Sequence, residues 1–132
     1  MIFDTSIWWV ILAVVVYMVV GALWYSPLLF AGPWMKAVGK SPDDMKGGNS
    51  SMYLVPAVGA VIVAVMLAYL AQAMGLHGWT SGAVLGIEMW LAFAATTALT
   101  NRVFQGGSMQ LFAIDLGYHL VGFIAAGALV VH

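Results

Sequence analysis

Four long apolar stretches dominate the chain and limit what it can fold into. They cover residues 7–25, 53–74, 79–100 and 109–131, and the first two contain no charged residue. A helix needs about 20 mostly apolar residues to cross the hydrocarbon core of a bilayer, so each stretch is long enough to span it. We therefore predict an all-α integral membrane protein, in which four transmembrane helices form a bundle.

The composition supports this prediction. Of the 132 residues, 64% are hydrophobic and only 7% are charged, whereas a soluble domain carries about 25% charged residues. A chain so poor in charge cannot cover a globule with a solvated surface, and its length indicates a single domain over residues 1–132. The net charge of −1 and the four Lys and Arg residues argue against a nucleic-acid partner. The absence of cysteine excludes disulfides, thiolate catalysis and iron–sulfur clusters.

The basic residues predict an orientation. Lys36, Lys40 and Lys46 lie in the loop of residues 27–52, and Arg102 lies between the third and fourth spans. These two loops share one side of the membrane, and short loops rich in Lys and Arg face the cytoplasm. We predict that both termini lie outside a plasma membrane. The first span is expected to be retained, because no basic leader precedes it as in a signal peptide.

The loop of residues 27–52 is predicted to contain short helices. In "PWMKAVGK", Pro33 suits the first helical turn and Gly39 the end. The sequence Ser41-Pro42-Asp43-Asp44 indicates a second helix start, with a serine cap and acidic residues in the first turn. Trp34 and Met35 beside Lys36 favour a short helix lying along the cytoplasmic interface. We expect an anchored connector, and a gate or re-entrant element is the alternative.

Small residues recur at helical spacing in the last three spans. Helices in lipid associate through close packing and interhelical hydrogen bonds, so such stripes predict helix contacts. The stripes could pack within one chain or across a homo-oligomer, and a dimer is our expectation because symmetric homo-oligomers are common. The predicted packing residues include Ala60, Ala64, Gly82, Gly86 and Gly122.

Ionisable residues interrupt the last two spans. Asp115 and His119 lie one helical turn apart, and Glu88 lies in the third span. At 1.5 Å per residue, Glu88 lies roughly 14 Å from one interface and His119 roughly 16 Å from the other, so both are near the middle of a core about 30 Å thick. Tyr17 lies at a similar depth. A charged Asp at this depth costs about 2.5–3.5 kcal/mol, so we expect these four side chains to face inward as one polar cluster.

The polar cluster permits several functions. The hypothesis we favour is transport of protons or a small solute, with Glu88 and Asp115 as proton carriers and His119 as the relay. The alternative is a non-catalytic structural or accessory membrane subunit, in which the same groups only hydrogen-bond the helices together. A third possibility is a metal site with Glu88, Asp115 and His119 as ligands. The sequence has no Ser-His-Asp set, phosphate loop or nucleotide motif, so an enzyme is disfavoured and no cofactor is expected.

Two stretches resemble a known family. "GALWYSPLLFAGPWMKAVG" (residues 21–39) and "AIDLGYHLVG" (residues 113–122) are similar to the small membrane-protein family called domain of unknown function 1761. The resemblance implies a four-span fold and a membrane location, and brings no activity. It makes Trp24, Tyr25 and Pro27 a candidate shared site, with a cytoplasmic-interface anchor as the structural alternative; His119 is not part of the family pattern. The matching residues are Leu23, Trp24, Tyr25, Pro27, Leu28, Phe30, Trp34, Met35, Gly39, Gly117 and Tyr118.

Overall fold

The computed structural model describes residues 7–39 and 51–132, with the side chains from residue 53 on in the second part. This described part is helical and contains no strand. Four helices in it are long and apolar enough to cross a membrane, so the predicted all-α membrane fold is confirmed. The elements are α1 (Ile7–Trp24), α2 (Ala31–Val38), α4 (Ser51–Ala73), α5 (Trp79–Met89), the π-helical segment η1 (Trp90–Ala95), α6 (Thr96–Gln105) and α7 (Met109–Val130).

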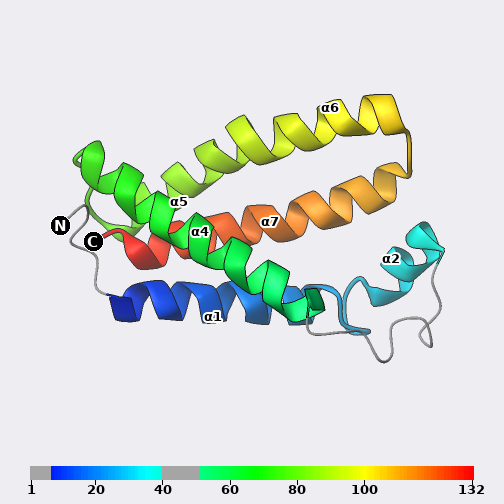
Figure 1. Ribbon diagram of the computed structural model, residues 1–132, viewed down its shortest axis with the longest axis horizontal. Helices are drawn as coiled ribbons and strands as arrows, with labels where there is room; N and C mark the ends of the chain where they lie inside the picture. Colours follow the sequence, from blue (N-terminus) through cyan, green and yellow to red (C-terminus); the bar gives the residue numbers. More distant parts are fainter. Residues whose placement is uncertain (1–6, 40–50) are drawn as a thin grey trace.

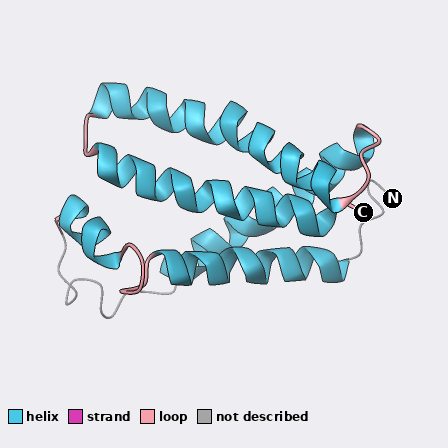
Figure 2. Cartoon of the chain, turned by 180° about the vertical axis from the view of Figure 1, so that it is seen from behind, coloured by secondary structure: helices cyan, strands magenta, loops and turns pink. Residues whose placement is uncertain are grey.

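The spans alternate in direction, and α5, η1 and α6 together form the third one. The start of α1 and the end of α7 lie at one end of the bundle, while α2 and the connection from α6 to α7 lie at the other (Figures 1 and 2). The two described basic residues, Lys36 on α2 and Arg102 on α6, therefore lie toward the same end. This end is called the loop end below.

Helix α7 is the centre of the bundle, because it contacts every other described helix. It lies between α1 and the third span, and α4 crosses over it (Figure 1). On α4, Ala60, Ala64, Ala68 and Ala71 are buried, and this helix packs against α1 and α7. The alanine stripe thus packs within the chain.

The closest helix contact joins α5 to α7 through glycines. A Cβ atom added to Gly82 would overlap the Gly127 carbonyl oxygen, and one added to Gly86 would overlap the Phe123 carbonyl oxygen. On the far side of α7, a Cβ on Gly122 would overlap the Tyr17 ring. Since packing in lipid depends on such close approach, these glycines determine how α7 sits between its neighbours.

The third span differs from the prediction. It was expected to end at Thr100, but α6 continues to Gln105 and η1 interrupts the span in the middle. Apolar content ends near Thr100, yet nothing there stops a helix. The stop comes at Gly106 and Gly107, whose φ angles of 75° and 113° suit glycine.

The other bounds differ from the prediction by at most two residues. Ser108 caps α7, its hydroxyl accepting from the Gln110 and Leu111 amides. The predicted short helix in the first loop is confirmed as α2, which ends at Gly39 with φ 74°. The predicted second helix start at residues 41–44 lies outside the described residues.

Candidate functional site

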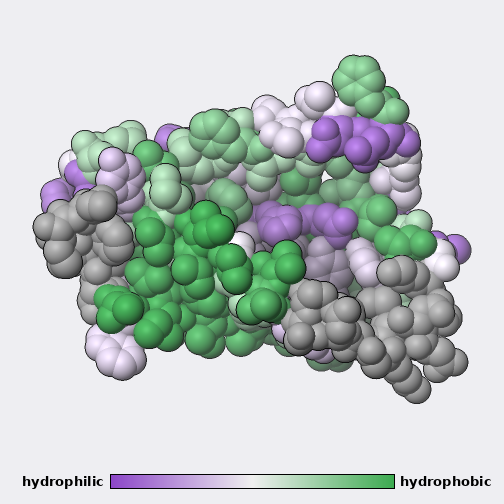
Figure 3. Space-filling model, viewed as in Figure 1, coloured by the Kyte–Doolittle hydropathy of each residue, from purple (hydrophilic) through white to green (hydrophobic). Residues whose placement is uncertain are grey.

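A wedge-shaped cavity opens between α6 and α7 toward the loop end. Helix α5 lies tightly against α7, but α6 diverges from it beyond η1 (Figures 1 and 2). The cavity has a volume of about 360 Å³. Figure 3 shows hydrophilic surface on α6 and α7 on both sides of this hollow, beside the hydrophobic surface over α4. We call it the wedge, and its polar lining is Asn101, Arg102, Gln105, Ser108, Asp115 and His119.

The π-helical segment marks the narrow end of the wedge. Its first residue, Trp90, donates from the indole nitrogen to the Leu116 carbonyl oxygen at 3.0 Å, which ties the segment to α7. A π-helix is wider than an α-helix and is frequent at functional sites. The divergence of α6 from α7 thus begins at a helix irregularity that is itself fixed to the opposite wall.

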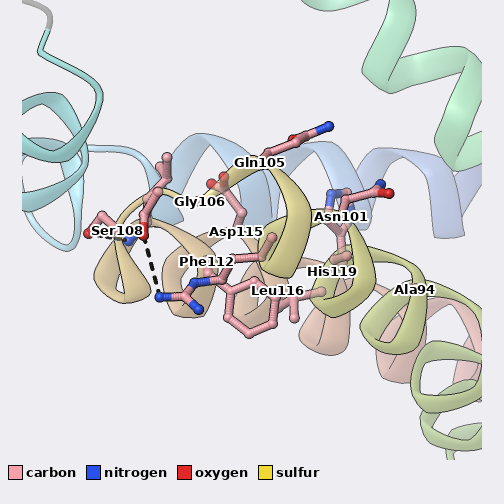
Figure 4. A pocket seen from close by; sticks show the side chains of 13 residues that line it. Ala94, Asn101, Gln105, Gly106, Ser108, Phe112, Asp115, Leu116 and His119 are labelled. Atoms are coloured by element: carbon pink, nitrogen blue, oxygen red, sulfur yellow. Dashed lines mark hydrogen bonds between the residues drawn. The ribbon is translucent and has the colours of Figure 1, made fainter.

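Asp115 and His119 line the wedge from α7. In Figure 4 they point to the same side of the helix, one turn apart, with Phe112 and Leu116 on the adjacent side. The Tyr25 hydroxyl donates to Asp115 Oδ1 at 2.6 Å. The Tyr17 hydroxyl lies 2.7 Å from His119 Nδ1. Asp115 and His119 are therefore each held by a tyrosine from the first span or its end.

Tyr118 joins the two tyrosines into one aromatic cluster. Its ring packs edge to face on Tyr17, with 5.4 Å between the centroids, and on Tyr25 at 5.5 Å. Its hydroxyl donates to the Tyr17 carbonyl oxygen at 3.4 Å. Tyr17 and Tyr118 are only 4% and 7% exposed. The cluster forms a packed support behind Asp115 and His119.

The two stretches that carry the family resemblance meet in space. The Trp24 indole nitrogen donates to the Ile114 carbonyl oxygen at 2.8 Å. The same ring faces Gly117, where an added Cβ would lie 2.9 Å from Trp24 Cζ2. Trp24 and Tyr25 are half-buried, and both donate hydrogen bonds to residues of α7. Both side chains therefore help to join the end of α1 to α7.

The remaining matching residues lie around this contact. Trp34, on α2, packs against the Tyr25 ring with 5.6 Å between the centroids. Pro27 lies exposed in the turn between α1 and α2. Its side chain is not among the residues that line the wedge.

Glu88 lies apart from the other predicted cluster residues. Its side chain is exposed on α5 and is not among the wedge residues. The structure thus brings Tyr17, Asp115 and His119 into one region and leaves Glu88 outside it. No group of three His, Asp or Glu residues in the described part could hold a metal ion.

Several wedge residues escaped the sequence analysis. The predicted bounds place Asn101, Arg102 and Gln105 in the connection between the third and fourth spans, where only Arg102 bears on a prediction, that of orientation. Tyr25 was noted for the family resemblance and not as the partner of Asp115. Helical spacing could have shown that Asn101 and Gln105 share a face, being four residues apart, but nothing in one sequence relates that face to α7.

A cavity also lies at the opposite end of the bundle. It has a volume of about 460 Å³ and is lined by Trp9, Gln72, His77 and His132, among others. His77 Nδ1 lies 3.1 Å from the His132 carbonyl oxygen, and the Trp9 ring packs on His132 with 4.4 Å between centroids. These contacts tie His132 to the turn between α4 and α5 and to α1.

Comparison with known proteins agrees with the resemblance seen in the sequence. No curated protein and no solved structure matches the chain. A family model described as "Protein of unknown function (DUF1761)" matches residues 8–131, which include every residue of the aromatic cluster and the wedge. The chain is therefore a member of the DUF1761 family of proteins of unknown function.

Proposed function

We propose that this membrane protein transports protons, or a small solute together with protons, and that Asp115 and His119 bind the proton in the wedge. The observation that carries the proposal is the pairing of a carboxylate and an imidazole, one turn apart, on the wall of a cavity within the spans. Ionisable residues inside a membrane are costly, and they commonly mark substrate or proton pathways.

The hydrogen bonds support a role in proton exchange. Tyr25 occupies one oxygen of the Asp115 carboxylate and Tyr17 one nitrogen of the His119 ring, and each group has a second atom able to bind a proton. Asp115 lies about 6 Å nearer the loop end than His119 along α7, from the helical rise. A proton entering from that end would reach Asp115 first, and a water molecule could bridge the remaining gap.

The test is proton flux in proteoliposomes containing a pH-sensitive dye, driven by a potassium gradient with valinomycin. We expect flux with the native protein and a loss of flux in Asp115→Asn and in His119→Gln. Glu88→Gln is the matched control, because it removes a carboxylate of the third span that does not line the wedge. Absence of native flux, or equal flux in Asp115→Asn, would contradict the proposal.

The proposed direction places both termini outside the plasma membrane. It rests on the positive residues of the loop end and is tested with single-cysteine variants, which need no background changes because the chain has no cysteine. We expect His77→Cys to react with an impermeant maleimide in intact cells and Lys36→Cys to react only after permeabilisation. The reverse pattern would invert the orientation.

A second candidate function is that of a structural or accessory subunit, including a homodimer. The exposure of Glu88 favours it: the described residues give this carboxylate no hydrogen bond or ion pair, and a charge facing lipid at mid-span costs about 2.5–3.5 kcal/mol. A helix from a second copy would remove that cost. Single-molecule photobleaching in bilayers tests this, and one bleaching step per particle, unchanged in Glu88→Gln, would contradict it.

A further inference from the structure

We infer that the mouth of the wedge binds the phosphate or carboxylate group of an anionic amphiphile, with Arg102 as its main contact and the apolar chain lying between α6 and α7. This inference concerns ligand binding and stands independently of proton transport. Its basis is an arginine at the mouth that has no ion pair among the described residues, together with the apolar wall behind it.

The Arg102 guanidinium has only uncharged partners in the described part of the chain. One terminal nitrogen donates to the Gly107 carbonyl oxygen at 3.3 Å, and the group lies 5.8 Å from the centre of the Phe112 ring. Its Nε atom is buried and has no hydrogen-bond partner. Asp115 lines the same cavity, but it accepts a hydrogen bond from Tyr25 and forms no ion pair with Arg102. Leaving a buried donor unpaired is unfavourable. The guanidinium has five N–H donors and uses one terminal nitrogen for Gly107, so donors of the terminal nitrogens remain for an anion at the mouth.

Other groups at the mouth favour an anion as well. The α7 helix begins there, and its first-turn amides give this end a partial positive charge. The Ser108 hydroxyl already accepts hydrogen bonds from the Gln110 and Leu111 amides. The helix end therefore attracts an anion mainly through its partial positive charge and less through unpaired N–H donors. The side-chain amides of Asn101 and Gln105 line the same cavity and can donate hydrogen bonds.

The wall behind the mouth is apolar and continues into the spans. Ala94 and Ala98 line the α6 side, and Leu111, Phe112 and Leu116 line the α7 side. Alanine on one wall and larger side chains on the other leave a slot in which a hydrocarbon chain can lie. A cationic group at the membrane edge above an apolar slot is the complement of an anionic lipid, and this favours an amphiphile over a free ion.

The experiment measures binding to delipidated protein in detergent by native mass spectrometry. The probes are phosphatidylglycerol, phosphatidylcholine and inorganic phosphate. We expect phosphatidylglycerol to bind at least about tenfold more weakly to Arg102→Gln than to the native protein, as for loss of a charge-assisted hydrogen bond. Arg102→Lys should bind at an intermediate level, because it keeps the charge without the planar fork.

Two further variants make the test specific. Lys36→Gln is the matched control, since it removes one positive charge at the same end, from an exposed position on α2 outside the wedge, and should bind like the native protein. Ala98→Phe fills the apolar slot and should block phosphatidylglycerol while leaving phosphate binding intact. It also provides a test if Arg102→Gln does not fold.

The outcomes separate the sources of the anion. One outcome is that phosphate binding depends on Arg102 while phosphatidylglycerol binds no better than phosphatidylcholine. This result would overturn the amphiphile and show that the site binds a free anion. Equal binding of phosphatidylglycerol to the native protein and to Arg102→Gln would overturn the inference. Flux through Asp115 is measured separately, so failure of one proposal leaves the other open to its own test.

Discussion

Replacing Gly82 by alanine should force α5 and α7 apart. The added Cβ would lie 2.7 Å from the Gly127 carbonyl carbon and 2.7 Å from Val131 Cβ, and it would overlap the Gly127 carbonyl oxygen. Ordinary contact begins at 3.4 Å, so the helices must separate by at least about 0.7 Å. A gap of that size forfeits a quarter to a half of the dispersion energy of each contact along the seam.

The magnitude follows from a matched comparison with Gly59→Ala. Gly59 lies in α4, and a Cβ there meets nothing within 4 Å. Both substitutions gain the preference of alanine over glycine in a helix, about 0.5–1 kcal/mol, so this gain cancels in the difference. What remains is the cost of overpacking, typically 1–3 kcal/mol. We expect Gly82→Ala to be about 2 kcal/mol less stable than Gly59→Ala.

The assay is SDS-induced unfolding in mixed micelles, followed by tryptophan fluorescence. Trp24 and Trp90 donate hydrogen bonds to α7 carbonyl groups and should report loss of the bundle. A difference of 2 kcal/mol changes the unfolding equilibrium roughly 30-fold, well within such a measurement. If Gly82→Ala unfolds at the same SDS fraction as Gly59→Ala, the close α5–α7 contact described above is incorrect.

Three further predictions address the wedge and its frame. Tyr25→Phe removes the donor to Asp115 and should lower the unfolding free energy by about 1 kcal/mol, the order found for membrane hydrogen bonds; an unchanged SDS midpoint would contradict this hydrogen bond. Gly106→Ala should cost about 1–3 kcal/mol in the same assay, because its φ of 75° and ψ of −159° are nearly restricted to glycine, and native stability would refute that backbone geometry. Deleting Phe93 from η1 should be tolerated, since a π turn holds one residue more than an α turn. Deleting Val84 from α5 should abolish the yield of folded protein in detergent, because the deletion rotates every later residue of the helix by about 100° around the helix axis. Equal yields of the Phe93 and Val84 deletions would argue against the π segment.

The spans could be predicted because their cause is local. Lipid offers no hydrogen bonds to the backbone, so a long apolar stretch must be helical whatever its neighbours are. The end of α2 at Gly39 and the start of α7 at Ser108 also depend on one or two residues each. The π-helical segment does not depend on such local signals. Its sequence "WLAFAA" contains neither proline nor glycine and predicts an ordinary α-helix. Its geometry depends on contacts such as the one from Trp90 to Leu116.

The alanine stripe of α4 shows a second limit. Its spacing predicts a packing face, and Ala60 and Ala64 are indeed buried. The spacing does not reveal whether the partner is another span of the chain or another copy, because both would require the same small residues. Only the position of α4 against α1 and α7 decides this.

Glu88 and His119 show why depth alone could not define the candidate site. The helical rise places both near the middle of the bilayer, but a side chain at the right depth can still point in any direction around its helix. In a soluble helix the polar face would reveal that direction, whereas the spans here are apolar on nearly every face. The rotation of α5 is set by Gly82 and Gly86, which must face α7 because no larger residue fits there. That constraint makes Glu88 an exposed side chain. On α7, Gly127 must face Gly82 and Gly122 must face the Tyr17 ring for the same reason. Glycines, which carry no ionisable group, thus restrict how both helices are rotated and keep Glu88 apart from Asp115 and His119.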